Sequence, residues 1–186
     1  MARIPSPPIR QYPWFVRWVL RRQERKYGSI LAPSLLWGRL PGTFVGMLGL
    51  LGIFNRRSYP VGPGLRSLVS IRIAQCNGCS FCVDLNAYHY LEATGATDKA
   101  ANVSDWLISP LYDPPERAAL AYAEKVTERC SEVSEADIDG LREHFNDDQI
   151  TALTAWIAFQ NMSAKFNAAL GAEEHGFCAL PARRED

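Results

Sequence analysis

The spacing of apolar residues along the chain predicts helices in nearly every segment. Residues 14–27 carry apolar side chains at helical intervals, and Gly28 is a typical helix terminator. Residues 34–55 form a second apolar stretch that Pro41 interrupts, which predicts a helix, a break and then a buried helix. Residues 58–64 hold two prolines and two glycines and are expected to form a loop.

The next segment is ambiguous. Residues 65–74 alternate in part like a strand, yet other apolar positions of the same stretch fit a helix. The pair Asn77-Gly78 indicates a turn, and residues 79–94 return to helical spacing before Gly95. The apolar stripe of this second helix consists of Phe81, Leu85, Tyr88 and Leu91.

Capping signals divide the C-terminal half into further helices. The segment 113–116, Asp-Pro-Pro-Glu, has the N-cap, the early prolines and the capping-box glutamate of a helix start. Residues 134–144 predict a short helix, and Asp147 or Asp148 is expected to cap a long one that ends before Gly171. No strand pattern persists elsewhere, so the sequence predicts an all-α protein.

Charge and hydropathy narrow the classes of partner. Lys and Arg number 20, as do Asp and Glu, so the chain has no net basic field that would favour nucleic acid. The longest apolar run, residues 43–54, has about half the length that a membrane span needs. Residues 1–13 contain no apolar core of a signal peptide. We expect a cytoplasmic protein with neither nucleic acid nor membrane as a partner.

The candidate chemistry lies in a Cys-x-x-Cys motif at the predicted start of a helix. Cys79 and Cys82 lie one turn apart on one face, where they can close a disulfide. Unpaired backbone N–H groups and the positive end of the helix dipole favour the reactive thiolate there. The alternative is that both are small buried apolar residues, as many free cysteines are. An odd total of five cysteines does not suit a secreted disulfide framework.

Cys76 extends the motif to Cys-x-x-Cys-x-x-Cys, which raises the question of a metal. An iron–sulfur ligand run would need a fourth nearby cysteine, and a zinc site would need a second pair or nearby histidines. His144 and His175 come far later in the chain. The sequence therefore favours a thiol site without metal or other cofactor.

Three stretches together resemble a known family. The chain is similar to the AhpD-like alkylhydroperoxidase branch of the carboxymuconolactone decarboxylase family in three stretches. They are Arg72-Ile-Ala-Gln-Cys-Asn-Gly-Cys-Ser-Phe-Cys-Val-Asp-Leu85, the run Pro115-Glu-Arg-Ala-Ala-Leu-Ala-Tyr-Ala-Glu-Lys-Val-Thr127 and the segment 160–171. The resemblance covers about residues 64–171. It implies a helical reading of residues 65–74, and we expect an AhpD-like domain over residues 64–186 preceded by a helical extension over residues 1–63 packed on it.

The resemblance also implies an activity. Members of this family are all-helical homo-oligomers whose cysteine pair reduces peroxides or passes electrons between thiol partners. The resemblance implies that Cys82 is the cysteine that attacks the peroxide or faces the thiol partner and that Cys79 is the second cysteine of the pair. The helix-dipole argument instead favours Cys79 as the thiolate, so the assignment stays open. The expected partners are a hydroperoxide and a dithiol or thiol-protein reductant. The bulky apolar residues before Pro60 favour burial between subunits, in a homodimer or a higher assembly.

The chain departs from the family at two positions. The family's relay places a glutamate twelve residues before the first cysteine and a histidine four residues after the second, and here these positions are Ser67 and Asn86. Neither side chain can act as a base near neutral pH. His89 is the nearest substitute, about 10 Å beyond Cys82 along the helix axis. The alternative function is therefore a member that keeps the fold and the oligomer with little or no peroxidase activity.

Overall fold

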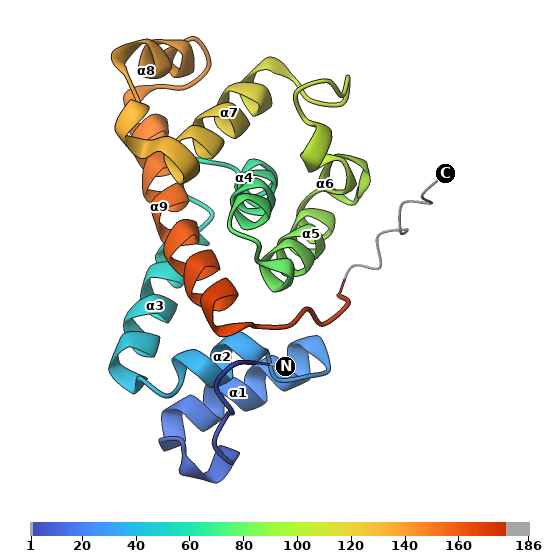
Figure 1. Cartoon of the computed structure of the whole chain (residues 1–186), viewed down its shortest axis with the longest axis vertical. Coiled ribbons are helices and arrows are strands. Elements are labelled where there is room, and N and C mark those ends of the chain that lie inside the picture. Colours follow the sequence, from blue (N-terminus) through green and yellow to red (C-terminus); the bar gives the residue numbers. More distant parts are fainter. Residues whose placement is uncertain (1, 178–186) are drawn as a thin grey trace.

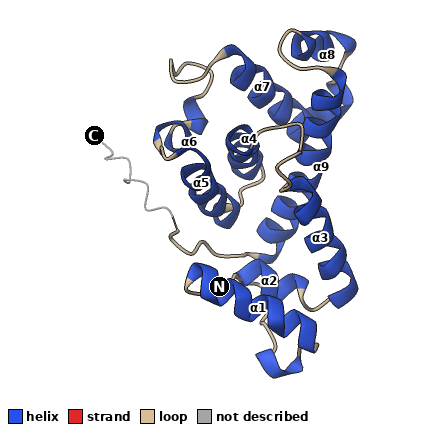
Figure 2. Cartoon of the chain, turned by 180° about the vertical axis from the view of Figure 1, so that it is seen from behind, coloured by secondary structure: helices blue, strands red, loops and turns tan. Residues whose placement is uncertain are grey.

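The computed structural model describes residues 2–177, and every regular element in that range is helical (Figure 2). No helix of this range is long and apolar enough to span a bilayer. The elements are η1 (Ile9–Gln11), α1 (Trp14–Tyr27), α2 (Ala32–Trp37), α3 (Pro41–Phe54), α4 (Pro63–Cys76), α5 (Ser80–Thr94), α6 (Asp98–Ala101), η2 (Val103–Asp105), α7 (Pro114–Arg129), η3 (Cys130–Glu132), α8 (Glu135–Arg142) and α9 (Asp147–Leu170). The all-α prediction is confirmed.

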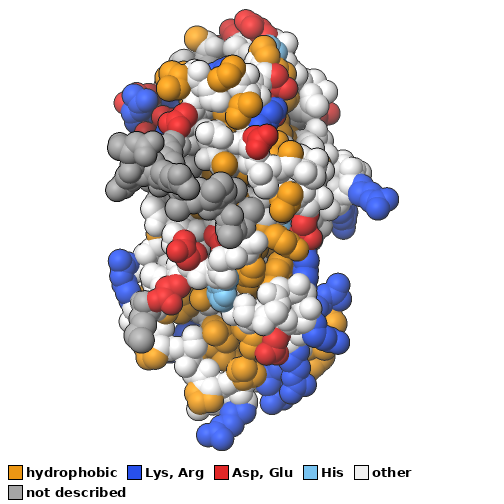
Figure 3. All heavy atoms as spheres, turned by 90° about the vertical axis from the view of Figure 1, so that its right-hand side faces the viewer, with side chains coloured by type: hydrophobic (Ala, Val, Ile, Leu, Met, Phe, Trp, Pro, Cys, Tyr) orange, Lys and Arg blue, Asp and Glu red, His pale blue; other side chains and the backbone are white. Residues whose placement is uncertain are grey.

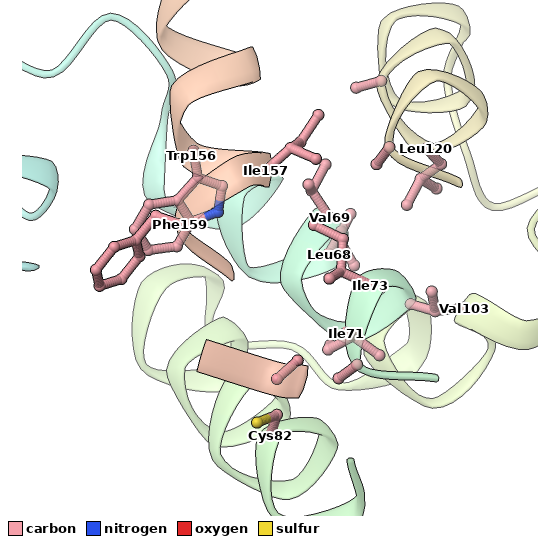
Figure 4. Close-up of a cluster of buried hydrophobic side chains, with 14 of the residues drawn as sticks. Leu68, Val69, Ile71, Ile73, Cys82, Val103, Leu120, Trp156, Ile157 and Phe159 are labelled. Carbon is pink, nitrogen blue, oxygen red and sulfur yellow. The ribbon is translucent and has the colours of Figure 1, made fainter. Parts of the chain in front are cut away.

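Helix α4 is the centre of the core. It packs against α5, α7 and α9, and Figure 1 shows it nearly end-on with these helices around it. Its side chains at Leu68, Val69, Ile71 and Ile73 are fully buried and face different neighbours (Figure 4). A helix buried on all sides has no amphipathic stripe. This explains why residues 65–74 were ambiguous by periodicity although they form a regular helix.

The predicted capping signals hold with one correction. Asp113 caps α7 and forms a capping box with Glu116, as predicted. The N-cap of α9 is Asn146, whose side chain accepts a hydrogen bond from the Gln149 backbone N–H, and not Asp147 or Asp148. Those two carboxylates lie in the first turn instead, where they interact favourably with the positive end of the helix dipole.

The N-terminal helices build a second apolar cluster. Its buried members are Tyr12, Val16, Leu20, Trp37 and Phe44. The ring of Trp37 stacks on Phe166 of α9 with centroids 3.7 Å apart, and this contact joins the cluster to the rest of the molecule. The division at residue 63 stays a prediction, and residues 178–186 of the second segment lie outside the described range.

Helix α3 differs from the prediction of a buried helix. Of its apolar side chains only Phe44 and Phe54 are buried, whereas Val45 is 52% exposed, and Leu50 and Ile53 are exposed to a similar degree. α3 lies at the edge of the molecule beside α9 (Figure 1). The sequence of α3 is apolar on every side, but a helix at the edge of one chain has neighbours on one side only.

The turn between α4 and α5 generates a stability prediction. Gly78 has a positive φ of 65°, a conformation that costs an L-residue about 1–2 kcal/mol. Gly140 lies in the exposed α8 helix with ordinary φ, and at both sites an added Cβ meets nothing within 4 Å. We expect Gly78→Ala to lower the free energy of unfolding by about 1–2 kcal/mol. We expect Gly140→Ala to raise it by about 0.5–1 kcal/mol.

Urea unfolding followed by circular dichroism measures both changes. Because neither methyl group has a steric neighbour, the opposite signs depend on backbone conformation alone. A Gly78→Ala protein as stable as the wild type would show that the turn does not need the left-handed conformation.

Candidate functional site

The two cysteines of the motif lie at the N-terminus of α5. Cys79 is the N-cap residue and Cys82 lies in the first turn, and their sulfur atoms are joined as a disulfide with the Cα atoms 5.3 Å apart. The backbone N–H of Cys82 donates to Cys79 Sγ at 3.3 Å. The two sulfur atoms therefore lie beside the free backbone N–H groups at the N-terminus of α5. Such groups stabilise a thiolate.

A chain of amide hydrogen bonds holds the preceding turn in place. Asn77 Nδ2 donates to the carbonyl of Ile73 and to Asn161 Oδ1, and Asn161 Nδ2 donates in turn to Thr127 Oγ1. These bonds connect the C-terminal ends of α4 and α7 to the interior of α9. The position of Cys79 is thus set by three helices and not by the turn alone.

The sulfur of Cys82 has a polar neighbour that sequence reasoning missed. Asn167 of α9 is 2% exposed, and its Nδ2 donates to Cys82 Sγ at 3.3 Å. A hydrogen-bond donor directed at sulfur stabilises a thiolate more than a thiol. Asn167 lies 85 residues after Cys82, and although it falls in the segment 160–171 that resembles the family, only the packing of α9 on α5 reveals its contact with the sulfur.

Cys82 opens on a cavity of about 600 Å³ between the N-terminal helices and α4, α5 and α9. The predicted relay positions Ser67 and Asn86 and the substitute His89 line the same cavity, whereas Cys79 does not. Asn86 Nδ2 donates to the carbonyl of Cys82 at 2.7 Å, which ties this side chain to its own helix. Four of the five residues singled out from the sequence therefore line one cavity, and the fifth, Cys79, is bonded to Cys82.

The imidazole of His89 is suited to remain neutral. Burial lowers its pKa below the usual value, and the nearby charge of Lys26 lowers it further, although Glu92 acts in the opposite direction. Its Nε2 lies 3.4 Å from the hydroxyl of Tyr27 on α1. His89 is thus a partly buried cavity residue in contact with the N-terminal helices, with a ring nitrogen that can accept a proton at neutral pH.

Arg66 is a second cavity residue that sequence reasoning missed. It precedes Ser67 on α4 and is 6% exposed. Its guanidinium lies between the rings of Tyr59 and Trp156, 5.3 Å from each ring centroid. An arginine between apolar residues of a predicted helix is usually a surface residue, so the sequence held no signal that this one is buried.

The other cysteines lie apart from the pair. Cys76 and Cys130 are free, and Cys178 lies outside the described residues. Burial raises the pKa of Cys76 to about 11, which keeps its thiol protonated at neutral pH. Among residues 2–177 no cluster of three potential metal ligands is found.

The segment after α9 crosses the start of α5. The carboxylate of Asp84 accepts hydrogen bonds from the backbone N–H groups of His175 and Phe177, both at 3.1 Å. The His175 ring accepts from the Ala32 backbone N–H through Nε2 and lies 3.2 Å from Ser29 Oγ through Nδ1. This segment therefore connects α5 to the N-terminal helices beside the cysteine pair.

The carboxymuconolactone decarboxylase family model matches residues 58–125. The chain is 40% identical over 178 residues to the uncharacterized protein YnjA of Escherichia coli strain K12, covering 96% of this chain and 98% of YnjA. Among solved structures, the AhpD core of a peroxidase-related protein from Ralstonia eutropha JMP134 has a TM-score of 0.85 at 23% identity and covers 94% of this chain and 93% of that one.

A third structure, the debrominase Bmp8, has a TM-score of 0.76 at 20% identity and covers 88% of each chain. The structural similarities agree with the helical architecture. The chain belongs to the carboxymuconolactone decarboxylase family, and its fold is similar to that of an AhpD core.

Proposed function

We propose that this protein is a thiol-dependent peroxidase in which Cys82 attacks a hydroperoxide and Cys79 resolves the product. The observation that carries the proposal is the position of Cys82, which is half of a disulfide and also lines a cavity large enough for an organic substrate. Cys79 does not line that cavity, which favours Cys82 as the attacking residue.

The proposed reaction takes place in two steps on the protein. The Cys82 thiolate attacks the terminal oxygen of the hydroperoxide, an S–O bond forms, the O–O bond breaks, and the alkoxide leaves as an alcohol after taking up a proton. The Cys79 thiol then attacks the sulfenic acid, so that an S–S bond forms and water leaves. A dithiol molecule or protein returns two electrons and two protons by thiol–disulfide exchange.

The polar groups near Cys82 support thiolate formation without a strong base. Asn167 donates to the sulfur, and the N-terminus of α5 adds about 0.3–1 kcal/mol of favourable dipole interaction. Ser67 and Asn86 have no proton affinity near neutral pH. His89 is the cavity residue best suited to accept a proton, and because it lies two helical turns from Cys82 the transfer would pass through water.

The alternative is a member that keeps the fold but reduces peroxides slowly or not at all. The presence of Ser67 and Asn86 in the cavity favours it, because general-base help is worth typically 10²–10⁴-fold in rate. Bmp8 is named a debrominase, so a protein with a similar fold is assigned a reaction other than peroxide reduction. Peroxide turnover separates the two functions.

The cysteine assignment can be tested by single substitutions. We expect Cys82→Ser to abolish peroxide consumption, and Cys79→Ser to allow one turnover that leaves a sulfenic acid on Cys82. Cys76→Ser is the matched control and should retain activity, because the raised pKa of Cys76 keeps that thiol unreactive. Peroxide assays with mass spectrometry measure all three. A Cys79→Ser protein with full turnover, or sulfenic acid on Cys79 in the Cys82→Ser protein, would contradict the assignment.

The altered relay predicts a distinctive pH profile. We expect weak peroxidase activity at pH 7. The activity should rise with pH, because the fraction of Cys82 present as thiolate increases as the pH approaches the pKa of the thiol. The double variant Ser67→Glu with Asn86→His should raise the rate near neutrality by about tenfold or more, within the usual range for general-base help. Steady-state rates from pH 6 to pH 9 test this, and His89→Ala is the companion variant. A high wild-type rate at pH 7 that His89→Ala removes would assign the base to His89.

We also propose that the chain forms a homodimer or a higher assembly. Trp14 and Trp18 are exposed, as are Val45, Leu50 and Ile53 of α3. In Figure 3, apolar side chains gather on the lower part of the visible face, where the N-terminal helices lie. Exposed large apolar side chains of this kind are found at subunit interfaces. Free Cys76 and Cys130 suit a reducing compartment, so we propose the cytoplasm as the site of action.

The assembly can be tested with a charge placed on α3. We expect Val45→Glu combined with Ile53→Glu to convert the oligomer to a monomer in multi-angle light scattering, because burial of two unpaired carboxylates in an interface is strongly unfavourable. Ile108→Glu is the control, since Ile108 is 83% exposed and lies outside the N-terminal helices. A wild-type chain that is monomeric at micromolar concentration would contradict the proposal.

A further inference from the structure

The cavity beside Cys82 contains an unusual concentration of unpaired polar groups. Within residues 2–177, five buried side-chain N or O atoms have no hydrogen-bond partner. All five belong to residues that line this cavity, and they are Gln23 Oε1, Trp37 Nε1, Arg66 Nε, Arg66 Nη1 and Asn167 Oδ1. Buried polar groups in native proteins are nearly always paired. Their gathering around one hollow indicates a ligand that supplies the missing partners.

Two of the three unpaired donor atoms belong to one charged group, the guanidinium of Arg66. Arg66 provides two unpaired N–H donors, and its guanidinium contacts the faces of two aromatic rings instead of a carboxylate. None of the ion pairs between described residues includes Arg66. A buried cation without an anionic partner is strongly unfavourable, which makes the site selective for an anion.

The remaining charges of the cavity wall do not offset Arg66. Lys26 forms an ion pair with Glu92 at 3.6 Å, and the lowered pKa of His89 keeps that imidazole neutral. Burial also lowers the pKa of Arg66, yet a guanidinium stays protonated at any physiological pH. One unbalanced positive charge therefore faces the hollow.

The rest of the wall is suited to an apolar body. Trp37, Met47 and Leu51 come from the N-terminal helices, and Phe159 comes from α9. A cavity of about 600 Å³ has the size of sites that enclose small organic molecules and far exceeds the needs of hydrogen peroxide. Apolar walls with a few placed polar groups are the usual composition of such sites.

We propose that the Cys82 cavity binds an organic monocarboxylate, with the carboxylate on Arg66 and an apolar body between the N-terminal helices and α9. Guanidinium and carboxylate have matching planar geometry and can form two parallel hydrogen bonds. A phosphate monoester carries nearly two charges and would need a second cation, which the Lys26–Glu92 pair does not offer. If the protein is the peroxidase proposed above, its substrate is a hydroperoxide that carries a carboxylate; this consequence, and not the binding itself, rests on the proposed function.

The test compares two ligands of the same shape on the oxidised protein. Calorimetric titration with 3-phenylpropionate and with its neutral counterpart 3-phenylpropan-1-ol should show the acid binding at least about tenfold more tightly. Arg66→Gln should weaken binding of the acid about ten- to hundredfold, the usual effect of losing a charged hydrogen-bond partner, and leave the alcohol unchanged. Arg66→Lys keeps the charge but not the planar fork, and should give an intermediate affinity.

Arg57→Gln is the matched control, because Arg57 is exposed and the charge change is the same. Equal affinity of the two ligands for the wild type, or an Arg66→Gln protein that keeps the preference for the acid, would overturn the proposal. The wild-type comparison decides the point even if Arg66→Gln does not fold. Since the disulfide form cannot react with peroxide, the binding result is independent of turnover. Preferential acid binding without peroxidase activity would retain the anion site and reject only the proposed reaction.

Discussion

The burial of α4 on all sides is the constraint on which the rest of the structure depends. Its apolar side chains contact α5, α7 and α9 at once, so these three helices take their positions from it. The end of α4 leads directly into the turn at Gly78 and the N-terminus of α5, which places Cys79 and Cys82. Arg66 and Ser67 lie near the other end of the same helix, so α4 also provides part of the cavity wall.

The cavity exists because two apolar clusters meet without closing completely. The core around α4 and the cluster of the N-terminal helices touch through the stack of Trp37 on Phe166. The cavity lies between these clusters, and its wall draws residues from both. Any change in how α1–α3 sit on α9 would therefore alter the site, although these helices lie far from the cysteine motif in sequence.

The electrostatics of the site divide into two regions. Around the two sulfur atoms the hydrogen-bond donors are uncharged. They are the backbone N–H groups at the N-terminus of α5 and the side-chain amide of Asn167. Elsewhere in the cavity wall, the guanidinium of Arg66 supplies a full charge in apolar surroundings, where it interacts more strongly than it would in water. In the proposed function the first region prepares the nucleophile and the second positions the substrate.

Local sequence determined the elements and the motif of this protein. Capping pairs such as Asp113 with Glu116, terminators such as Gly28 and Gly95, and helical spacing act within a few residues, so they can be recognised without a structure. Cys79 and Cys82 were recognised for the same reason. Only the tertiary structure decided that α3 lies at an edge, that Asn167 contacts Cys82 across 85 residues, and that Arg66 lines a cavity without a carboxylate partner of its own. Burial and pairing of side chains depend on which helices become neighbours, and no spacing along one helix contains that information.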